Sequence, residues 1–311
     1  ILPIKNETTT TKQTNEETYK FKVKVVGVDT PIAIEEKSSV TTGTDTLIAL
    51  TNNQNESGLY TITHPADNTL QIGNDKDITE YRYRGASPKN YVTFNNKTWR
   101  IIGVFPTDDG TGKIENRIKI IKDQSIGNKF WDTSKSNNWA RPATLNTELN
   151  TTYLNSLDST SKSMIGNTKY YLGGYSNSKI QKDVMYQYER KTNGSAYYNG
   201  SNPNSWVGKL ALMYASDYGY AASDECTQTL YNYDNATCKN NNWLFKGNDE
   251  WMLPQFTSGS GNTLSVGSDG HAGSLSVNFS QFVVRPVLYL TSSAKITGGS
   301  GTSTNPYTLG L

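Results

Sequence analysis

The sequence predicts a mixed α+β protein built mainly on antiparallel strands, and three observations carry that prediction. Short segments with alternating apolar and polar residues recur along the chain, which is typical of strands with one buried face. Turn-forming clusters of Asn, Gly, Ser and Asp separate these segments. Two stretches, 144–157 and 180–190, instead repeat their apolar residues at helical spacing. We therefore expect antiparallel strands together with two helices.

The composition limits the class of protein. A chain of 311 residues is long enough for one large or two modest domains with a buried core. A hydrophobic fraction of 34%, with 20 tyrosines, is typical of a loop-rich β protein. The net charge of +2 comes from interspersed bases and acids, which argues against nucleic acid as a partner. No run of about 18 apolar residues is present, so we expect no membrane span in this chain.

The N-terminal part divides into two regions. Residues 1–18 are rich in Thr, Glu and Lys without periodicity, which is typical of a stalk or linker. A segment that becomes ordered by pairing with another subunit is the alternative. Residues 19–28 alternate between apolar and lysine side chains and predict a strand. Shorter strand-like pieces follow at 31–34, 46–50 and 59–63. We interpret 19–78 as a small β-rich region.

A second region, 79–311, opens with a hairpin that turns at 95–97. Strands are predicted at 91–94, 98–105 and 117–122. The turn at 108–112 contains acids that suggest calcium, but it lacks the repeated acidic spacing and final Glu of an EF-hand, so we interpret it as a plain turn. After the two helical stretches, 206–213 predicts a buried strand or a short helix.

The cysteines bear on the compartment. Closing the short loop between Cys226 and Cys238 would stabilise the fold by roughly 3 kcal/mol. A zinc site would need His ligands, and His64 and His271 lie far away in the sequence. We predict a disulfide, with two free thiols as the alternative, and no metal or other cofactor. A disulfide favours a location outside the cell, and the start at Ile1 rather than Met suggests that an upstream signal or anchor has been removed.

The segment 251–281 carries the predicted binding surface, because apolar residues enclose a run of Ser, Gly, Asn and Asp there. Five apolar side chains are expected to face the core: Leu264, Val266, Leu275, Val277 and Phe279. Alternation then turns Ser265, Ser276 and Asn278 toward solvent. The predicted ligand-contacting residues are Trp251, Gln255, Asn262, Ser265, Asp269, His271, Ser276, Asn278 and Gln281.

An ordered series of motifs along 46–309 resembles a family of surface proteins of gut Firmicutes and Mollicutes. The motifs are YRYRGASPKNYVTFNNKTWRIIGVF, DDGTGKIENRIKIIKDQSIG, GKLALMYASDYGYA, NNWLF with EWMLP, and VVRPVLYLTSSAKITGGSGTSTNPYTL. The C-terminal half is also similar to the C-type-lectin-like fold, in the branch shared with formylglycine-generating enzymes and retroelement-diversified receptors. The resemblance implies an early hairpin that pairs with the last strands, two flanking helices, and a loop-rich ligand-binding segment before the final strand.

The motifs that carry activity in those relatives are missing. Cys226 and Cys238 do not match the copper-binding cysteine pair of the formylglycine-generating enzymes, and the calcium-binding tripeptide of true C-type lectins is absent. Asp269 and His271 lie two residues apart on a turn, with no Gly-x-Ser-x-Gly motif after an apolar strand. The spacing of the acids assigns no glycosidase pair. We therefore predict that the protein is not an enzyme.

Two functions remain. The first is an extracellular or cell-surface recognition protein, which binds a protein or glycan on another cell or host surface through 251–281. The alternative is a structural subunit of a pilus-like or phage-like filament. In that case the partner is another copy of the chain, and the N-terminal segment adds to the sheet edge of its neighbour.

Overall fold

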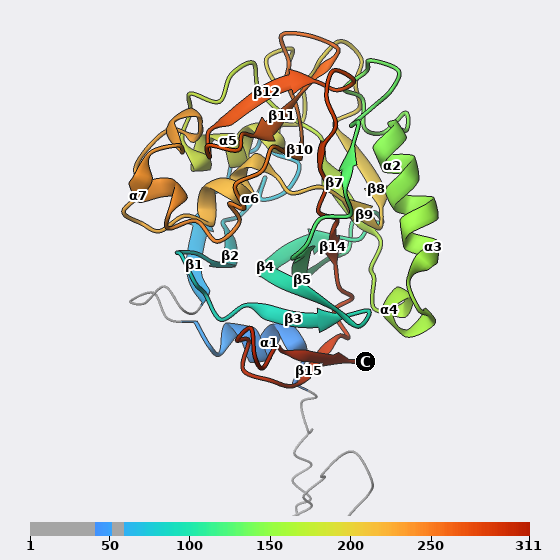
Figure 1. Ribbon diagram of the computed structural model, residues 1–311, viewed down its shortest axis with the longest axis vertical. Coiled ribbons are helices and arrows are strands. Elements are labelled where there is room, and N and C mark those ends of the chain that lie inside the picture. The colour runs from blue at the N-terminus through green and yellow to red at the C-terminus, as the bar shows by residue number, and fades with distance from the viewer. Residues whose placement is uncertain (1–40, 52–58) are drawn as a thin grey trace, which may run out of the picture. The chain divides into compact units, whose positions relative to one another are not determined.

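Antiparallel pairing dominates the part of the chain that the computed structural model describes, residues 41–51 and 59–311 (Figure 1). Two larger sheets are accompanied by short helices, so the predicted mixed α+β class is confirmed. The predicted stalk at 1–18 and the predicted strands at 19–28 and 31–34 lie outside the described residues.

The larger sheet has seven strands in the order β1-β2-β4-β5-β14-β9, with β3 paired to β4, and its ladders are antiparallel. Its strands are β1 (Leu59–His64), β2 (Ile78–Tyr83), β3 (Tyr91–Phe94), β4 (Lys97–Asp108), β5 (Ile114–Lys122), β9 (Leu210–Ala211) and β14 (Val287–Tyr289). In β5, Lys122 pairs with Trp99 of β4. Two residues earlier on the same strand, Ile120 pairs with Leu288 of β14. The early hairpin and a late strand therefore belong to one sheet.

The β3–β4 hairpin turns at Asn95 and Asn96, whose φ angles of 51° and 53° lie in the left-handed region. A two-residue hairpin turn needs positive φ at both positions, which Asn tolerates better than most residues. Further along β4, the register against β5 shifts between Ile101 and Gly103. A Cβ at Gly103 would lie 2.0 Å from the carbonyl oxygen of Tyr81, so only glycine lets β2 approach β4 here.

The second sheet carries the predicted binding segment and has the order β12-β11-β10-β13-β6. Its strands are β6 (Asn128–Lys129), β10 (Glu250–Gln255), β11 (Asn262–Val266), β12 (Ala272–Ser276) and β13 (Phe282–Val283). The β10–β13 pair is parallel, and the other ladders are antiparallel. Two small sheets pair β7 (Thr168–Tyr171) with β8 (Ser205–Gly208) and β15 (Lys295–Gly298) with β16 (Thr308–Gly310). The predicted element at 206–213 is thus divided between β8 and β9.

The helices are short. They are α1 (Gly43–Ile48), α2 (Thr144–Glu148), η1 (Leu149–Tyr153), α3 (Leu154–Ser156), α4 (Ser159–Ser163), α5 (Lys182–Glu189), α6 (Ala215–Tyr220), η2 (Leu230–Asn232) and α7 (Ala236–Lys239). The helix predicted at 144–157 is confirmed as the run α2–η1–α3, and α5 confirms the one at 180–190. In the view of Figure 1, α2–α4 and α7 lie on opposite sides of the sheets.

The strand predicted at 46–50 is wrong, because α1 occupies most of that segment. Thr42 caps α1: its hydroxyl accepts from the backbone N–H of Asp45 at 3.1 Å, and the Asp45 carboxylate accepts from the N–H of Thr42. This reciprocal capping box satisfies two backbone donors at the start of the helix. The cap therefore decides the local structure against the weak alternation of Thr and apolar residues.

A network of buried charges lies between the large sheet and α6. Asp217 of α6 accepts hydrogen bonds from the Arg82 guanidinium (2.9 Å) and the Lys119 ammonium (2.5 Å). Arg82 also pairs with Glu80 at 2.8 Å. All four side chains are at most 2% exposed. Because buried charges are tolerated only when they are paired, these contacts fix α6 against β2 and β5.

The predicted disulfide joins Cys226 and Cys238 and closes the segment that contains η2 and part of α7. Both cysteines are buried, at 3% and 0% exposure. Among the described residues, no helix is long and apolar enough to cross a membrane.

Candidate functional site

The β11–β12 hairpin positions most of the predicted binding residues. Asn262 pairs with Ser276 at one end of the hairpin. At the other end the turn 267–271 closes through the Gly267 N–H, which donates to the His271 carbonyl at 2.8 Å. Five residues per strand at about 3.3 Å per residue separate the two ends by roughly 13–17 Å. The predicted residues therefore form two groups rather than one.

Three of the predicted residues are buried. The Trp251 indole stacks on Phe282 with 4.6 Å between ring centroids and donates to the Lys129 carbonyl at 2.8 Å. Ser265 lies on β11, which is enclosed between β10 and β12. Gln255 is 2% exposed. Buried side chains do not contact a ligand at the surface, so these three residues support the surface from beneath.

The predicted alternation of buried and exposed side chains is wrong at Ser265 and at Phe279. Ser265 was expected to face solvent, but it is 6% exposed because β11 is a central strand that is covered on both faces. Phe279 was expected in the core, but it is 76% exposed. Strand β12 ends at Ser276, and a turn follows in which the Phe279 N–H donates to the Ser276 carbonyl at 3.1 Å. The turn breaks the period of two, so Val277 is buried while Phe279 points outward.

The first group of accessible residues surrounds Phe279. We define the Phe279 patch as Asn262, Ser276, Asn278, Phe279 and Gln281. The four polar members are half-buried or exposed, and the Ser276 hydroxyl donates to the Asn278 side chain at 3.1 Å. An exposed aromatic ring among amide and hydroxyl groups combines apolar contact area with adaptable hydrogen bonding. Sequence reasoning missed Phe279, although the turn-forming Asn278 was a signal that the strand could end before it.

The second group lies on the turn 267–271. The Asp269 carboxylate bonds the His271 ring at 2.5 Å. Burial alone would raise the pKa of Asp269, but hydrogen bonds from the His271 ring and backbone outweigh it and hold that pKa below its usual range. The His271 ring also packs edge-on against Tyr231, which is 45% exposed, with 5.8 Å between centroids. The Cys226–Cys238 segment therefore adds a tyrosine to this end of the hairpin.

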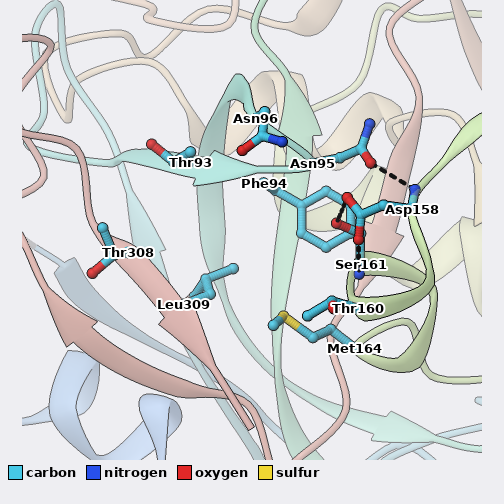
Figure 2. A pocket seen from close by; sticks show the side chains of 10 residues that line it. All are labelled: Thr93, Phe94, Asn95, Asn96, Asp158, Thr160, Ser161, Met164, Thr308 and Leu309. Atoms are coloured by element: carbon cyan, nitrogen blue, oxygen red, sulfur yellow. Dashed lines mark hydrogen bonds between the residues drawn. The ribbon is translucent and has the colours of Figure 1, made fainter.

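A pocket that the sequence did not predict lies elsewhere on the molecule (Figure 2). It has a volume of about 400 Å³ and is lined by the β3–β4 turn, α4 and β16. Phe94, Met164 and Leu309 supply its apolar lining. The pieces come from three distant parts of the chain, so no local pattern could have revealed them. Figure 1 shows β3 and α4 at the opposite end of the view from β12, far from the hairpin.

Asn95, Asp158 and Ser161 of this pocket hydrogen bond one another within the fold. The Asn95 side chain accepts from the Asp158 N–H at 2.9 Å, and Asp158 caps α4 by accepting from the Ser161 N–H at 2.7 Å. These bonds from Ser161 lower the pKa of Asp158. Asp158, the carboxylate that lines this pocket, thus serves the helix cap.

Within the described residues, no group of three or more His, Cys, Asp or Glu side chains is arranged to hold a metal ion. In comparisons with known proteins, the chain matches no protein-family model, no curated protein and no solved structure.

Proposed function

We propose that the chain is an extracellular, surface-displayed recognition protein that binds a protein or glycan through its 251–281 surface, with the Phe279 patch as the main contact. The observation that carries the proposal is the 76% exposure of Phe279 beside Asn262, Asn278 and Gln281. Leaving a large aromatic side chain in water gains no stability for the fold. A binding partner that covers the ring removes this apolar surface from water.

The Cys226–Cys238 disulfide supports an oxidising, extracytoplasmic compartment.

The finer fold assignment is part of the same proposal. A C-type-lectin-like fold, and membership of the gut surface-protein family with it, is supported by the early hairpin and the late strand that share one sheet. The filament function depends on the strand predicted at 19–28, which lies outside the described residues. It stays an alternative that light scattering of the full chain separates from a monomeric receptor.

The test uses the full chain, labelled with a fluorophore, on a panel of host epithelial and bacterial cells, measured by flow cytometry. We expect staining of at least one cell type by the wild type. Replacing Asn262, Asn278 and Phe279 by alanine should abolish that staining while the melting temperature stays within a few degrees, because exposed positions contribute within about ±0.5 kcal/mol each. The matched control replaces Ile114, an exposed apolar residue of β5 outside the 251–281 surface, by alanine and should stain cells as the wild type does. Undiminished staining by the three-residue variant would refute the proposal.

A further inference from the structure

Three tyrosines from separate segments lie in a row, each ring tilted against the next, close to the β10–β11 loop. The Tyr188 ring lies 4.7 Å from the Tyr175 ring and 4.7 Å from the Tyr197 ring, with interplanar angles of 54° and 51°. Each of the three side chains is half-buried. We call these three residues the tyrosine row.

The backbone is built to hold the row together. The Gly173 N–H donates to the Glu189 carbonyl at 3.0 Å, which places the segment before Tyr175 against the end of α5 beside Tyr188. The Gly174 N–H donates to the Tyr197 carbonyl at 2.9 Å, which brings the third segment alongside.

Gln255 links the two loops that carry Tyr175 and Tyr197. Its side-chain amide donates to the Leu172 carbonyl at 2.6 Å, and its Oε1 accepts from the Asn199 N–H at 2.8 Å. A Cβ at Gly174 would lie 1.9 Å from the Gln255 carbonyl oxygen, so the glycine is required for this approach. Gln255, predicted from the sequence to touch a ligand, is thus a positioning residue for Tyr175 and Tyr197.

The row differs from the structural tyrosines of this fold. Tyr60, Tyr218 and Tyr233 are buried, and each donates its hydroxyl to a backbone carbonyl. In contrast, none of the three hydroxyls of the tyrosine row hydrogen bonds to the described part of the chain. Their rings are ordered by contact with one another, while their hydroxyls remain available to a ligand.

The surroundings of the row favour a sugar over a protein surface. Ser176 and Asn177 follow Tyr175, Asn193 and Ser195 precede Tyr197, and all four are polar and at least partly exposed. The core of a protein interface is enriched in apolar area. Among the described residues the exposed large hydrophobic side chains are Leu50, Ile114, Val207, Tyr231, Phe279 and Leu311, and none of them belongs to these loops. A pyranose ring matches the row better, because its C–H face packs on the electron-rich ring faces while its hydroxyls bond the phenols and amides.

We propose that the tyrosine row is a carbohydrate-binding site on which a pyranose ring stacks. The loop 256–261 connects it to the proposed recognition surface: the Thr257 hydroxyl donates to the Ala196 carbonyl at 2.9 Å, and the Val277 N–H donates to the Gly261 carbonyl at 2.8 Å. This inference rests on the proposed recognition function and names a glycan as its ligand.

The test is an array of defined host and bacterial oligosaccharides, probed with the full chain. We expect binding to at least one oligosaccharide and a loss of about tenfold in affinity in each of Tyr175→Ala and Tyr197→Ala, equivalent to about 1.4 kcal/mol. Tyr197→Phe keeps the ring and should lose less than the alanine variant. Ile114→Ala, at an exposed apolar residue of β5 outside the tyrosine row and the 251–281 surface, is the control and should bind as the wild type does. Equal binding by the two alanine variants and the wild type, or an equal loss in Tyr197→Phe and Tyr197→Ala, would overturn the proposal.

A second measurement does not depend on the variants folding. Saturation-transfer NMR on the wild type, with irradiation of aromatic protons and the best array oligosaccharide as probe, should transfer magnetisation to pyranose C–H protons. Absence of this transfer, or an array without any bound oligosaccharide, would overturn the carbohydrate site. If cells are still stained in a Phe279-dependent manner in that case, the recognition function stands with a protein partner. Loss of both results would remove both proposals.

Discussion

Replacing Asp217 by asparagine removes the carboxylate that neutralises two buried cations. Arg82 and Lys119 bond it at 2.9 and 2.5 Å, and the Tyr214 N–H donates to it at 2.9 Å. Arg82 keeps Glu80 as a partner, but the Lys119 ammonium has no other carboxylate among its described contacts and is 0% exposed. Removing one partner of a buried ion pair costs about 3–5 kcal/mol. At about 2–4 °C per kcal/mol for a domain near this size, the melting temperature should fall by roughly 6–20 °C.

Differential scanning calorimetry of the full chain measures this change directly. The matched control is Asp269→Asn, the same substitution at a carboxylate that is 58% exposed, and it should change the stability by no more than about 0.5 kcal/mol. Adding Lys119→Met to Asp217→Asn removes the orphaned ammonium and should recover part of the loss. Equal melting temperatures for Asp217→Asn and Asp269→Asn would refute the view that the buried charges hold α6 on the sheet.

Three further predictions concern stability. Phe279→Ala should change the free energy of unfolding by no more than about 0.5 kcal/mol in a denaturant titration. Val277→Ala should cost clearly more, because Val277 is 0% exposed. A larger loss in Phe279→Ala than in Val277→Ala would restore the alternation predicted from the sequence. Burial acts to raise the pKa of Glu80, but Arg82 outweighs it and lowers that pKa. Burial also acts to raise the pKa of Asp217, but Lys119 and Arg82 together lower it. The ionised Glu80 and Asp217 therefore contribute their full stabilisation above the ordinary carboxyl pKa range, near about pH 4, and lose it as the pH falls below that range. Melting temperatures should drop steeply only on the acid side. A decline that is already complete by pH 5 would contradict this. Replacing Cys226 and Cys238 together by serine should cost roughly 3 kcal/mol, and alkylation of both thiols in the unreduced wild type would show that the disulfide is absent.

The sequence was informative where a local pattern was enforced by the core. The hairpin at 91–105 and the helices at 144–157 and 180–190 were predictable because their apolar residues repeat with one clear period. The disulfide was predictable because only one pairing of two cysteines exists. The strand predicted at 46–50 is wrong because a capping box, and not hydrophobic alternation, decides the structure there.

The binding surface was less predictable for physical reasons. Alternation says which side of a strand a residue occupies, but it does not show that β11 is covered on both faces or that β12 ends before Phe279. Those facts depend on neighbouring strands and on a turn. The tyrosine row was beyond prediction because residues 175, 188 and 197 come together through backbone bonds that join two loops to each other and to the end of α5. No spacing in the sequence records such bonds.

Hydrogen–deuterium exchange of the full chain with and without a bound cell-surface extract tests the central claim most directly. Recognition through the 251–281 surface predicts new protection in 256–281, centred on the peptides that contain Asn262 and Phe279. The peptides of the pocket between β3, α4 and β16 should be unchanged and serve as an internal reference. Protection confined to 93–96, 158–164 and 308–309, with 256–281 unaffected, would contradict the account.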